Sequence, residues 1–231
     1  MIDWLLAILL ILALPGWAIW KSRRPRKPPS AQRTLGYIKA IMLTVVLLAV
    51  CLLNWWRAGQ PWRALGFDVP LSLRGEIGLA LAVLLLVIAA IASRIASRKA
   101  SYDSNAAPKP ASDEDPLAPR TRQELWLLII VVVLLGAGWE ILYRGFLLWL
   151  LVPRVGSVAA ICIAALAYGL AHGCKDWKGA LISIGIAFAF TIAYALTYSL
   201  WWLMLIHVAI ALGAVVIGFR SRDKAPAPVS A

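Results

Sequence analysis

The chain has 231 residues, 62% of them apolar, and a mean hydropathy of +0.81. Several apolar runs reach the about 20 residues that cross a bilayer, which excludes a soluble domain and predicts an all-α polytopic transmembrane helical bundle. The net charge of +12 could indicate a nucleic-acid partner, but the basic residues flank apolar runs instead of forming one patch. We therefore expect contacts with membrane lipids and no nucleic acid.

The first part of the chain predicts three membrane spans, at about 2–20, 37–56 and 77–95. Basic residues follow the first run and do not precede it, which favours an uncleaved anchor with its N-terminus outside over a secretory signal. The connection 57–74 contains glycine and proline residues and is expected to be ordered but irregular, with an eighth span or a re-entrant piece as the alternative. We assign residues 1–95 to an N-terminal three-helix part.

The rest of the chain predicts a linker, a membrane core and a tail. Residues 96–123 are rich in Ser, Ala and Pro with charges of both signs, which predicts a disordered cytoplasmic linker. The core, 124–219, is followed by a basic tail, 220–231. Its four expected spans are 125–152, 157–174, 179–198 and 200–219. With about seven spans most Lys and Arg residues fall on one side, so we expect a cytoplasmic C-terminus and a bacterial inner (plasma) membrane.

An acid and a base, Glu140 and Arg144, lie four residues apart inside the run 125–152. Residues four apart share a helix face, and Glu before Arg is the favourable order. Charges at membrane depth cost roughly 2.5–3.5 kcal/mol each, so they are rare and usually face a bundle interior. From these two residues alone, a structural ion pair and a functional site are equally good interpretations.

The two histidines, His172 and His207, lie in the same four-helix core as that pair. This concentration favours one shared internal cavity over unrelated polar positions. A carboxylate and an imidazole can deprotonate a water, and a second imidazole can stabilise an oxyanion. A proton relay in a transporter is a weaker alternative. Zinc is possible but has no supporting ligand spacing, so no cofactor is expected, and the cysteines are interpreted as small core residues.

Three motifs carry a resemblance to a known family. They read Trp139-Glu140-Ile141-Leu142-Tyr143-Arg144-Gly145-Phe146, Tyr168-Gly169-Leu170-Ala171-His172 and His207-Val208-Ala209-Ile210-Ala211. In this order, over about 125–219, they resemble the CPBP family of intramembrane proteases, also called the Abi or type II CAAX endopeptidase family. Leu65-Gly66-Phe67 also resembles a segment common ahead of that family's core.

The resemblance implies an intramembrane endopeptidase that acts on a membrane-associated protein or peptide. Glu140 with His172 would activate water, His207 would stabilise the oxyanion, and Arg144 would orient Glu140. On the expected boundaries, His172 lies near the cytoplasmic end of its helix and Glu140 lies deeper. The site then requires either different boundaries or a tall cavity.

Two departures from the family pattern favour another hypothesis. The first residue of the motif's glutamate pair, the family's usual base, is Trp139, and the polar position of the third motif is Ala211. They are the reason to keep a catalytically inactive scaffold or an immunity or regulatory protein as the alternative. Adjacent helical residues point about 100° apart, so Glu140 replaces the missing base only where the helix is rotated or kinked. Gly136 and Gly138 would permit such a distortion.

Overall fold

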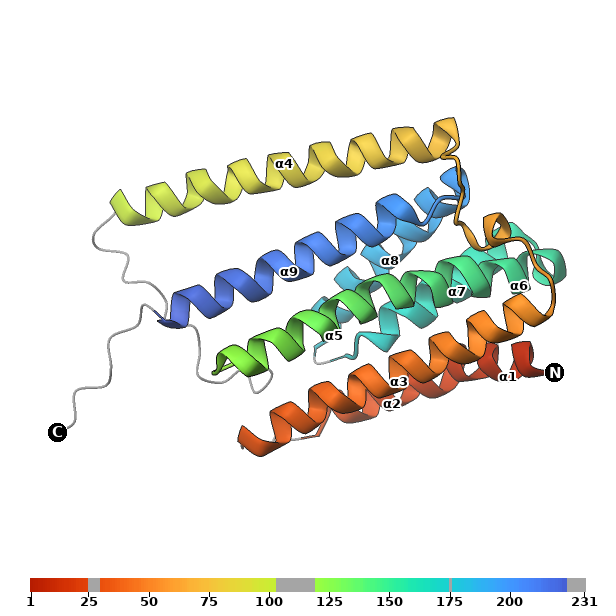
Figure 1. Cartoon of the computed structure of the whole chain (residues 1–231), viewed down its shortest axis with the longest axis horizontal. Helices are drawn as coiled ribbons and strands as arrows, with labels where there is room; N and C mark the ends of the chain where they lie inside the picture. The colour runs from red at the N-terminus through yellow and green to blue at the C-terminus, as the bar shows by residue number, and fades with distance from the viewer. Residues whose placement is uncertain (25–29, 103–118, 175, 224–231) are drawn as a thin grey trace.

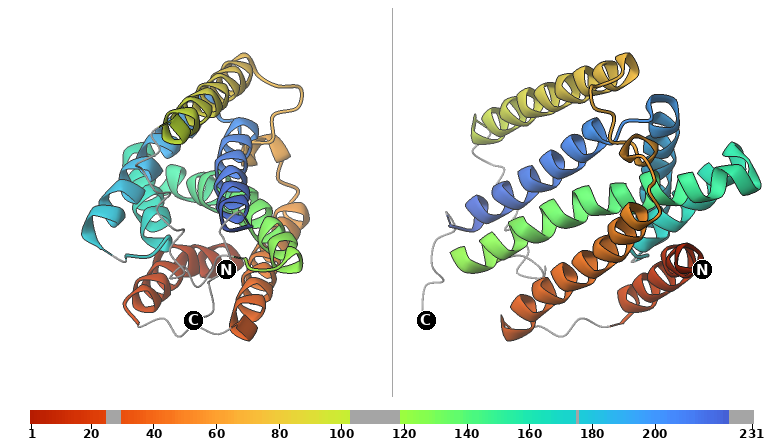
Figure 2. Two further views of the ribbon diagram at one scale, coloured as in Figure 1. Left: turned by 90° about the vertical axis from the view of Figure 1, so that its left-hand side faces the viewer. Right: turned by 45° about the vertical axis from the view of Figure 1, so that its right-hand side comes forward.

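The computed structural model describes residues 1–24, 30–102, 119–174 and 176–223. Within these ranges the chain forms helices and irregular connections and no strand. Figures 1 and 2 show an elongated bundle in which most helices run along the long axis. The predicted all-α polytopic bundle is confirmed, because six helices are long and apolar enough to cross a membrane.

The elements follow one another as a series of long helices broken by two π-helical segments and one 3₁₀ turn. In chain order they are α1 (Ile2–Ile8), π-helix η1 (Leu9–Ala13), α2 (Leu14–Ser22), α3 (Ser30–Arg57), 3₁₀ turn η2 (Trp62–Leu65), α4 (Leu73–Tyr102), α5 (Arg122–Glu140), π-helix η3 (Ile141–Phe146), α6 (Leu147–Val155), α7 (Ser157–Ala171), α8 (Trp177–Thr197) and α9 (Trp201–Asp223). The first three elements form one continuous span, as do α5, η3 and α6.

The fifth of the seven expected spans, 157–174, is shorter than predicted. Helix α7 has 15 residues, which is about 22 Å at 1.5 Å per residue, against a hydrocarbon core of about 30 Å. Gly156 and Gly173 bound it with φ of 80° and 87°, a backbone region that favours glycine. In Figure 1 the turn between α7 and α8 lies inward of the left-hand ends of α3 and α5. His172 directly follows α7, and its ring centre lies 6.4 Å from that of His207, so the difference in depth expected from the sequence does not separate the two histidines.

Other boundaries differ where polar residues extend a helix. Helix α4 continues to Tyr102, so the segment 96–123 begins helical, while 103–118 and the tail beyond 223 lie outside the described residues. The connection 57–74 is irregular, as expected, and its only described helical turn is η2. That turn packs on η3, where a Cβ at Gly145 would lie 2.5 Å from the Leu65 carbonyl oxygen.

The expected N-terminal and C-terminal parts share one core. Helix α5 packs against α3 as well as α9, and α2 packs against α7. Leu10 of the first span and Leu142, Tyr143 and Phe146 of η3 are almost fully buried in the same apolar cluster. The N-terminal spans therefore form part of the wall around the polar residues of the core.

The closest approach between α7 and α8 depends on Gly169. A Cβ there would lie 2.7 Å from Ile184 Cα, and the Ser183 hydroxyl donates to the Gly169 carbonyl at 3.1 Å. Because the obstructing atom is backbone, a side chain at 169 must push the two helices apart.

We predict that Gly169→Ala lowers the free energy of unfolding by about 1–3 kcal/mol, the usual cost of overpacking. Unfolding in mixed micelles, followed by circular dichroism, measures it. Gly185→Ala on α8 is the matched control, because nothing lies within 4 Å of its added Cβ. Equal stability of the two variants would contradict the close packing.

Candidate active site

The carboxylate of Glu140 lies at the centre of the polar residues in the core. Its side chain is 1% exposed, and Glu140 is the last residue of α5. Oε1 lies 3.3 Å from Arg144 Nη1, 3.1 Å from the donating Tyr168 hydroxyl and 2.8 Å from His207 Nδ1. These partners come from η3, α7 and α9, so one oxygen joins three separate parts of the chain.

Arg144 is entirely enclosed. Its guanidinium carbon lies 3.6 Å from the centre of the Tyr168 ring, and Nη2 donates to the Ala187 carbonyl at 3.5 Å. A buried cation with a carboxylate, an aromatic face and a carbonyl around it has its charge met within the protein. Arg144 thus holds Glu140 in place and is not accessible to a substrate.

A π-helix sets the relation between these two residues. Residues 141–146 form η3, directly after Glu140. Single π-helical turns are rare and often lie at functional sites. The helix is therefore distorted directly after Glu140, and not at Gly136 or Gly138, the glycines that would permit a distortion. These two glycines instead allow close packing of neighbouring helices. A Cβ added at Gly136 would lie 2.9 Å from a Val208 side-chain carbon, and one at Gly138 would lie 2.8 Å from a Leu48 side-chain carbon.

The two histidines lie on facing sides of the same space. Their ring centres are 6.4 Å apart with planes 24° from parallel. His172 Nδ1 donates to the Tyr168 carbonyl at 2.9 Å, while His207 Nδ1 contacts Glu140. Neither Nε2 atom has a hydrogen-bond partner among the described residues. Both imidazoles are therefore held through Nδ1 with the other nitrogen available.

The four residues selected from the sequence thus gather in one place, with a different pairing from the one expected. Glu140 contacts His207, whereas the resemblance paired it with His172. The His207 side chain is 29% exposed, and His172 is exposed at the end of α7. The imidazoles, and not the enclosed carboxylate, are the groups that a substrate can reach.

Residues 121–213 match the family model described as type II CAAX prenyl endopeptidase Rce1-like. This segment is therefore similar to that family. The resemblance drawn from the three motifs is confirmed, and the family is one of proteases. No curated protein and no solved structure matches the chain. The Rce1-like segment runs from the start of α5 into α9 and contains all four predicted site residues.

The two departures in the Rce1-like segment have different surroundings. The Trp139 indole lies edge-on to the His172 ring, with ring centres 5.9 Å apart, and 6.0 Å from the Tyr168 ring. An aromatic side chain therefore flanks His172 where the family motif has a carboxylate. Ala211 lies one helical turn beyond His207 and offers no polar atom.

The first span, outside the Rce1-like match, also holds the site. Tyr143 donates its hydroxyl hydrogen to the Leu10 carbonyl at 2.9 Å, joining η3 to η1. The Ser22 hydroxyl donates to the Cys174 carbonyl at 3.0 Å and accepts from the Cys174 N–H at 3.1 Å. These bonds fasten the turn that follows His172. Sequence analysis did not identify them, because hydroxyl-to-carbonyl contacts between distant helices have no spacing signal.

Among the described residues, no three His, Cys, Asp or Glu side chains lie together as a metal site would require. The cysteines are unpaired, with Cys51 buried and Cys162 and Cys174 partly buried. Among the described residues, the nitrogen ligands open to a metal ion are the Nε2 atoms of His172 and His207. The donor set therefore gives no support to a zinc site.

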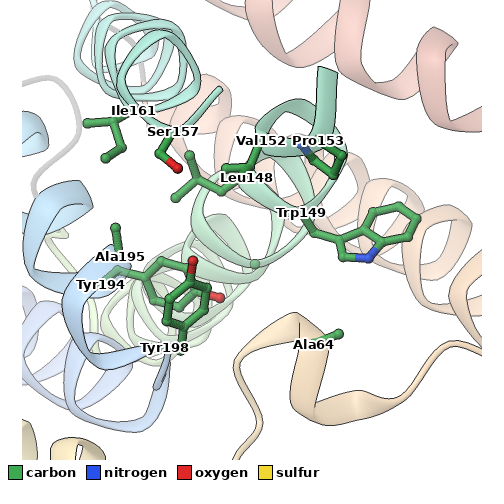
Figure 3. Close-up of a pocket in the computed structure, with 11 residues that line it drawn as sticks. Ala64, Leu148, Trp149, Val152, Pro153, Ser157, Ile161, Tyr194, Ala195 and Tyr198 are labelled. Carbon is green, nitrogen blue, oxygen red and sulfur yellow. The ribbon is translucent and has the colours of Figure 1, made fainter. Parts of the chain in front are cut away.

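A separate cavity of about 320 Å³ lies between α6, the start of α7 and the end of α8 (Figure 3). Its lining is mostly apolar and includes Leu148, Trp149, Val152, Ile161 and Tyr194. None of the four predicted site residues lines it. The cavity is thus distinct from the space between the imidazoles.

We predict that Arg144→Ala lowers the free energy of unfolding by about 3–5 kcal/mol, because it leaves the Glu140 carboxylate buried without its counter-charge. Unfolding in mixed micelles at neutral pH measures the loss. Arg154→Ala, at an exposed position on α6, is the control and should change stability by about 0.5 kcal/mol or less. A small loss in both variants would mean that the Glu140–Arg144 pair is not buried as described.

Proposed function

We propose that the chain is an intramembrane endopeptidase that cleaves a membrane-associated protein or peptide. The observation that carries this proposal is the 2.8 Å contact between Glu140 Oε1 and His207 Nδ1, which leaves His207 Nε2 available. A base whose second nitrogen is oriented by a carboxylate is the arrangement that activates nucleophiles in many hydrolases. The Rce1-like match supports peptide-bond hydrolysis as the reaction class.

His207 is the general base in this proposal. A water between the rings loses a proton to His207 Nε2 as its oxygen attacks the scissile carbonyl carbon. His172 lies across the same space and stabilises the oxyanion that forms when its Nε2 carries a proton. The tetrahedral intermediate then breaks its C–N bond, and the proton held by His207 passes to the leaving amine. Glu140 stabilises the charged His207, and Arg144 fixes Glu140.

The proposed setting is the bacterial inner (plasma) membrane, with the N-terminus outside and the C-terminus in the cytoplasm. Figure 1 supports opposite sides, because the N-terminus and the far end of α9 lie at opposite ends of the bundle. Basic residues stack on tryptophans beside the turn that carries His172. The pairs are Lys21 with Trp17 at 4.6 Å, Arg24 with Trp20 at 3.6 Å and Lys178 with Trp177 at 5.9 Å. Such pairs suit a cytoplasmic interface.

The test is a cleavage assay in nanodiscs with a panel of donor–quencher transmembrane peptides. We expect the wild type to cleave at least one peptide and His207→Ala to lower kcat by about 10²–10⁴-fold, the usual contribution of a general base. Ile210→Ala is the control, because this exposed side chain lies on the same helix. Cleavage at the same rate by wild type and His207→Ala would overturn the proposal.

The Trp139 ring beside His172 favours a second candidate, a catalytically inactive membrane scaffold or immunity or regulatory protein that binds a transmembrane peptide. This candidate requires that the wild type cleave no peptide in the panel and that Trp139→Glu with Ala211→Asn gain turnover. Robust cleavage by the wild type would reject it.

A further inference from the structure

Tyr168 contacts all four residues of the proposed site. Its hydroxyl oxygen lies 3.1 Å from Glu140 Oε1 and 3.1 Å from His207 Nδ1. Its ring lies under the Arg144 guanidinium, and its carbonyl oxygen accepts from His172 Nδ1. The sequence placed Tyr168 in the second motif as an aromatic residue without a chemical role.

The hydrogens available to this cluster restrict how it bonds. Glu140 Oε1, the Tyr168 oxygen and His207 Nδ1 form a triangle with sides of 2.8, 3.1 and 3.1 Å. The hydroxyl carries one hydrogen, the nitrogen carries at most one, and an ionised carboxylate carries none. Both hydrogens are used when the hydroxyl points at Oε1 and the Nδ1 hydrogen points at Oε1 or at the Tyr168 oxygen. In either arrangement neutral His207 carries its proton on Nδ1 and exposes a lone pair on Nε2.

The opposite tautomer is disfavoured by the same contacts. A bare Nδ1 would face the Glu140 carboxylate at 2.8 Å, lone pair against lone pair. The single Tyr168 hydrogen could then serve the nitrogen or the carboxylate, leaving the other without it. A flipped His207 ring would place a carbon where the hydroxyl and the carboxylate both meet nitrogen.

The Tyr168 ring is itself held in place. It is 5% exposed, with Arg144 on its face and the rings of Tyr143 and Trp139 at 5.1 and 6.0 Å. Packing on several sides leaves the hydroxyl little freedom to leave the triangle.

We propose that the Tyr168 hydroxyl is a positioning group that, together with Glu140, holds His207 in the Nδ1–H tautomer and aims its Nε2 lone pair at the substrate. Its partner residues do the chemistry, and Tyr168 acts through them. The kinetic consequence rests on the proposed endopeptidase function. The tautomer itself does not, so it can be measured whether or not the protein cleaves peptides.

The direct test is solid-state NMR of the full chain in liposomes with ¹⁵N-labelled histidine, assigned by the signals lost in His207→Phe. We expect Nδ1–H His207 in the wild type and a shifted Nδ1 resonance in Tyr168→Phe, because the Glu140 oxygen that accepts from Nδ1 loses its Tyr168 donor. Tyr194→Phe is the matched control. It removes a buried hydroxyl on α8 that makes no hydrogen bond to either histidine among the described residues, so it should leave the His207 signals unchanged. An unchanged His207 spectrum in Tyr168→Phe would overturn the inference.

The kinetic test uses the nanodisc assay. Tyr168→Phe should lower kcat by about 10–100-fold, the effect of one hydrogen bond to a charged group, with KM unchanged. A rise in KM with kcat unchanged would contradict a positioning role. If the wild type proves inactive, the proposed function fails and the ¹⁵N spectra still decide the tautomer.

A second variant covers the case in which Tyr168→Phe does not fold. Replacing Tyr168 with 3-fluorotyrosine keeps the ring and the hydroxyl while making the hydroxyl a stronger donor. Its bond to Glu140 should strengthen, and the His207 Nδ1 resonance should shift. A resonance identical to that of the wild type would overturn the inference.

Discussion

A carboxylate buried among membrane-spanning helices needs its charge met by the protein, and this requirement organises the core. Glu140 is enclosed, so the donors to its Oε1 come from the protein itself. Arg144 supplies the counter-charge from the same helix, and Tyr168 and His207 supply donors from α7 and α9. The position of one side chain thus fixes how three elements meet.

The helices outside the Rce1-like match complete the site instead of forming a separate unit. The first span faces η3 with its own π-helical segment and bonds to Tyr143 there, and it fastens the turn after His172 through Ser22. Gly138 of α5 packs closely against Leu48 of α3. His172 follows the short α7, and its ring centre lies 5.9 Å from that of Trp139, the residue before the buried carboxylate.

The sequence predicted the helices and the participants in the site, because both depend on patterns that single residues carry. Apolar run length predicts spans, and Glu140, Arg144 and two histidines are costly in lipid wherever they lie. The pairing could not be predicted. Whether Glu140 meets His172 or His207 depends on a π-helix that hydropathy does not encode and on the angle of α9. The sequence showed Tyr168 four residues before His172. The role of its hydroxyl could be assigned only from the positions of both histidines in the structure.

The account stands on the contact between Glu140 and His207. Solid-state NMR of the chain in liposomes, with ¹³C-labelled glutamate and ¹⁵N-labelled histidine, measures it directly as dipolar transfer between a carboxyl carbon and an imidazole Nδ1. The account predicts strong transfer to His207, consistent with the 2.8 Å separation of Oε1 and Nδ1, and its loss in Glu140→Gln with unlabelled Gln. Transfer to His172 instead, or to neither histidine, would contradict it.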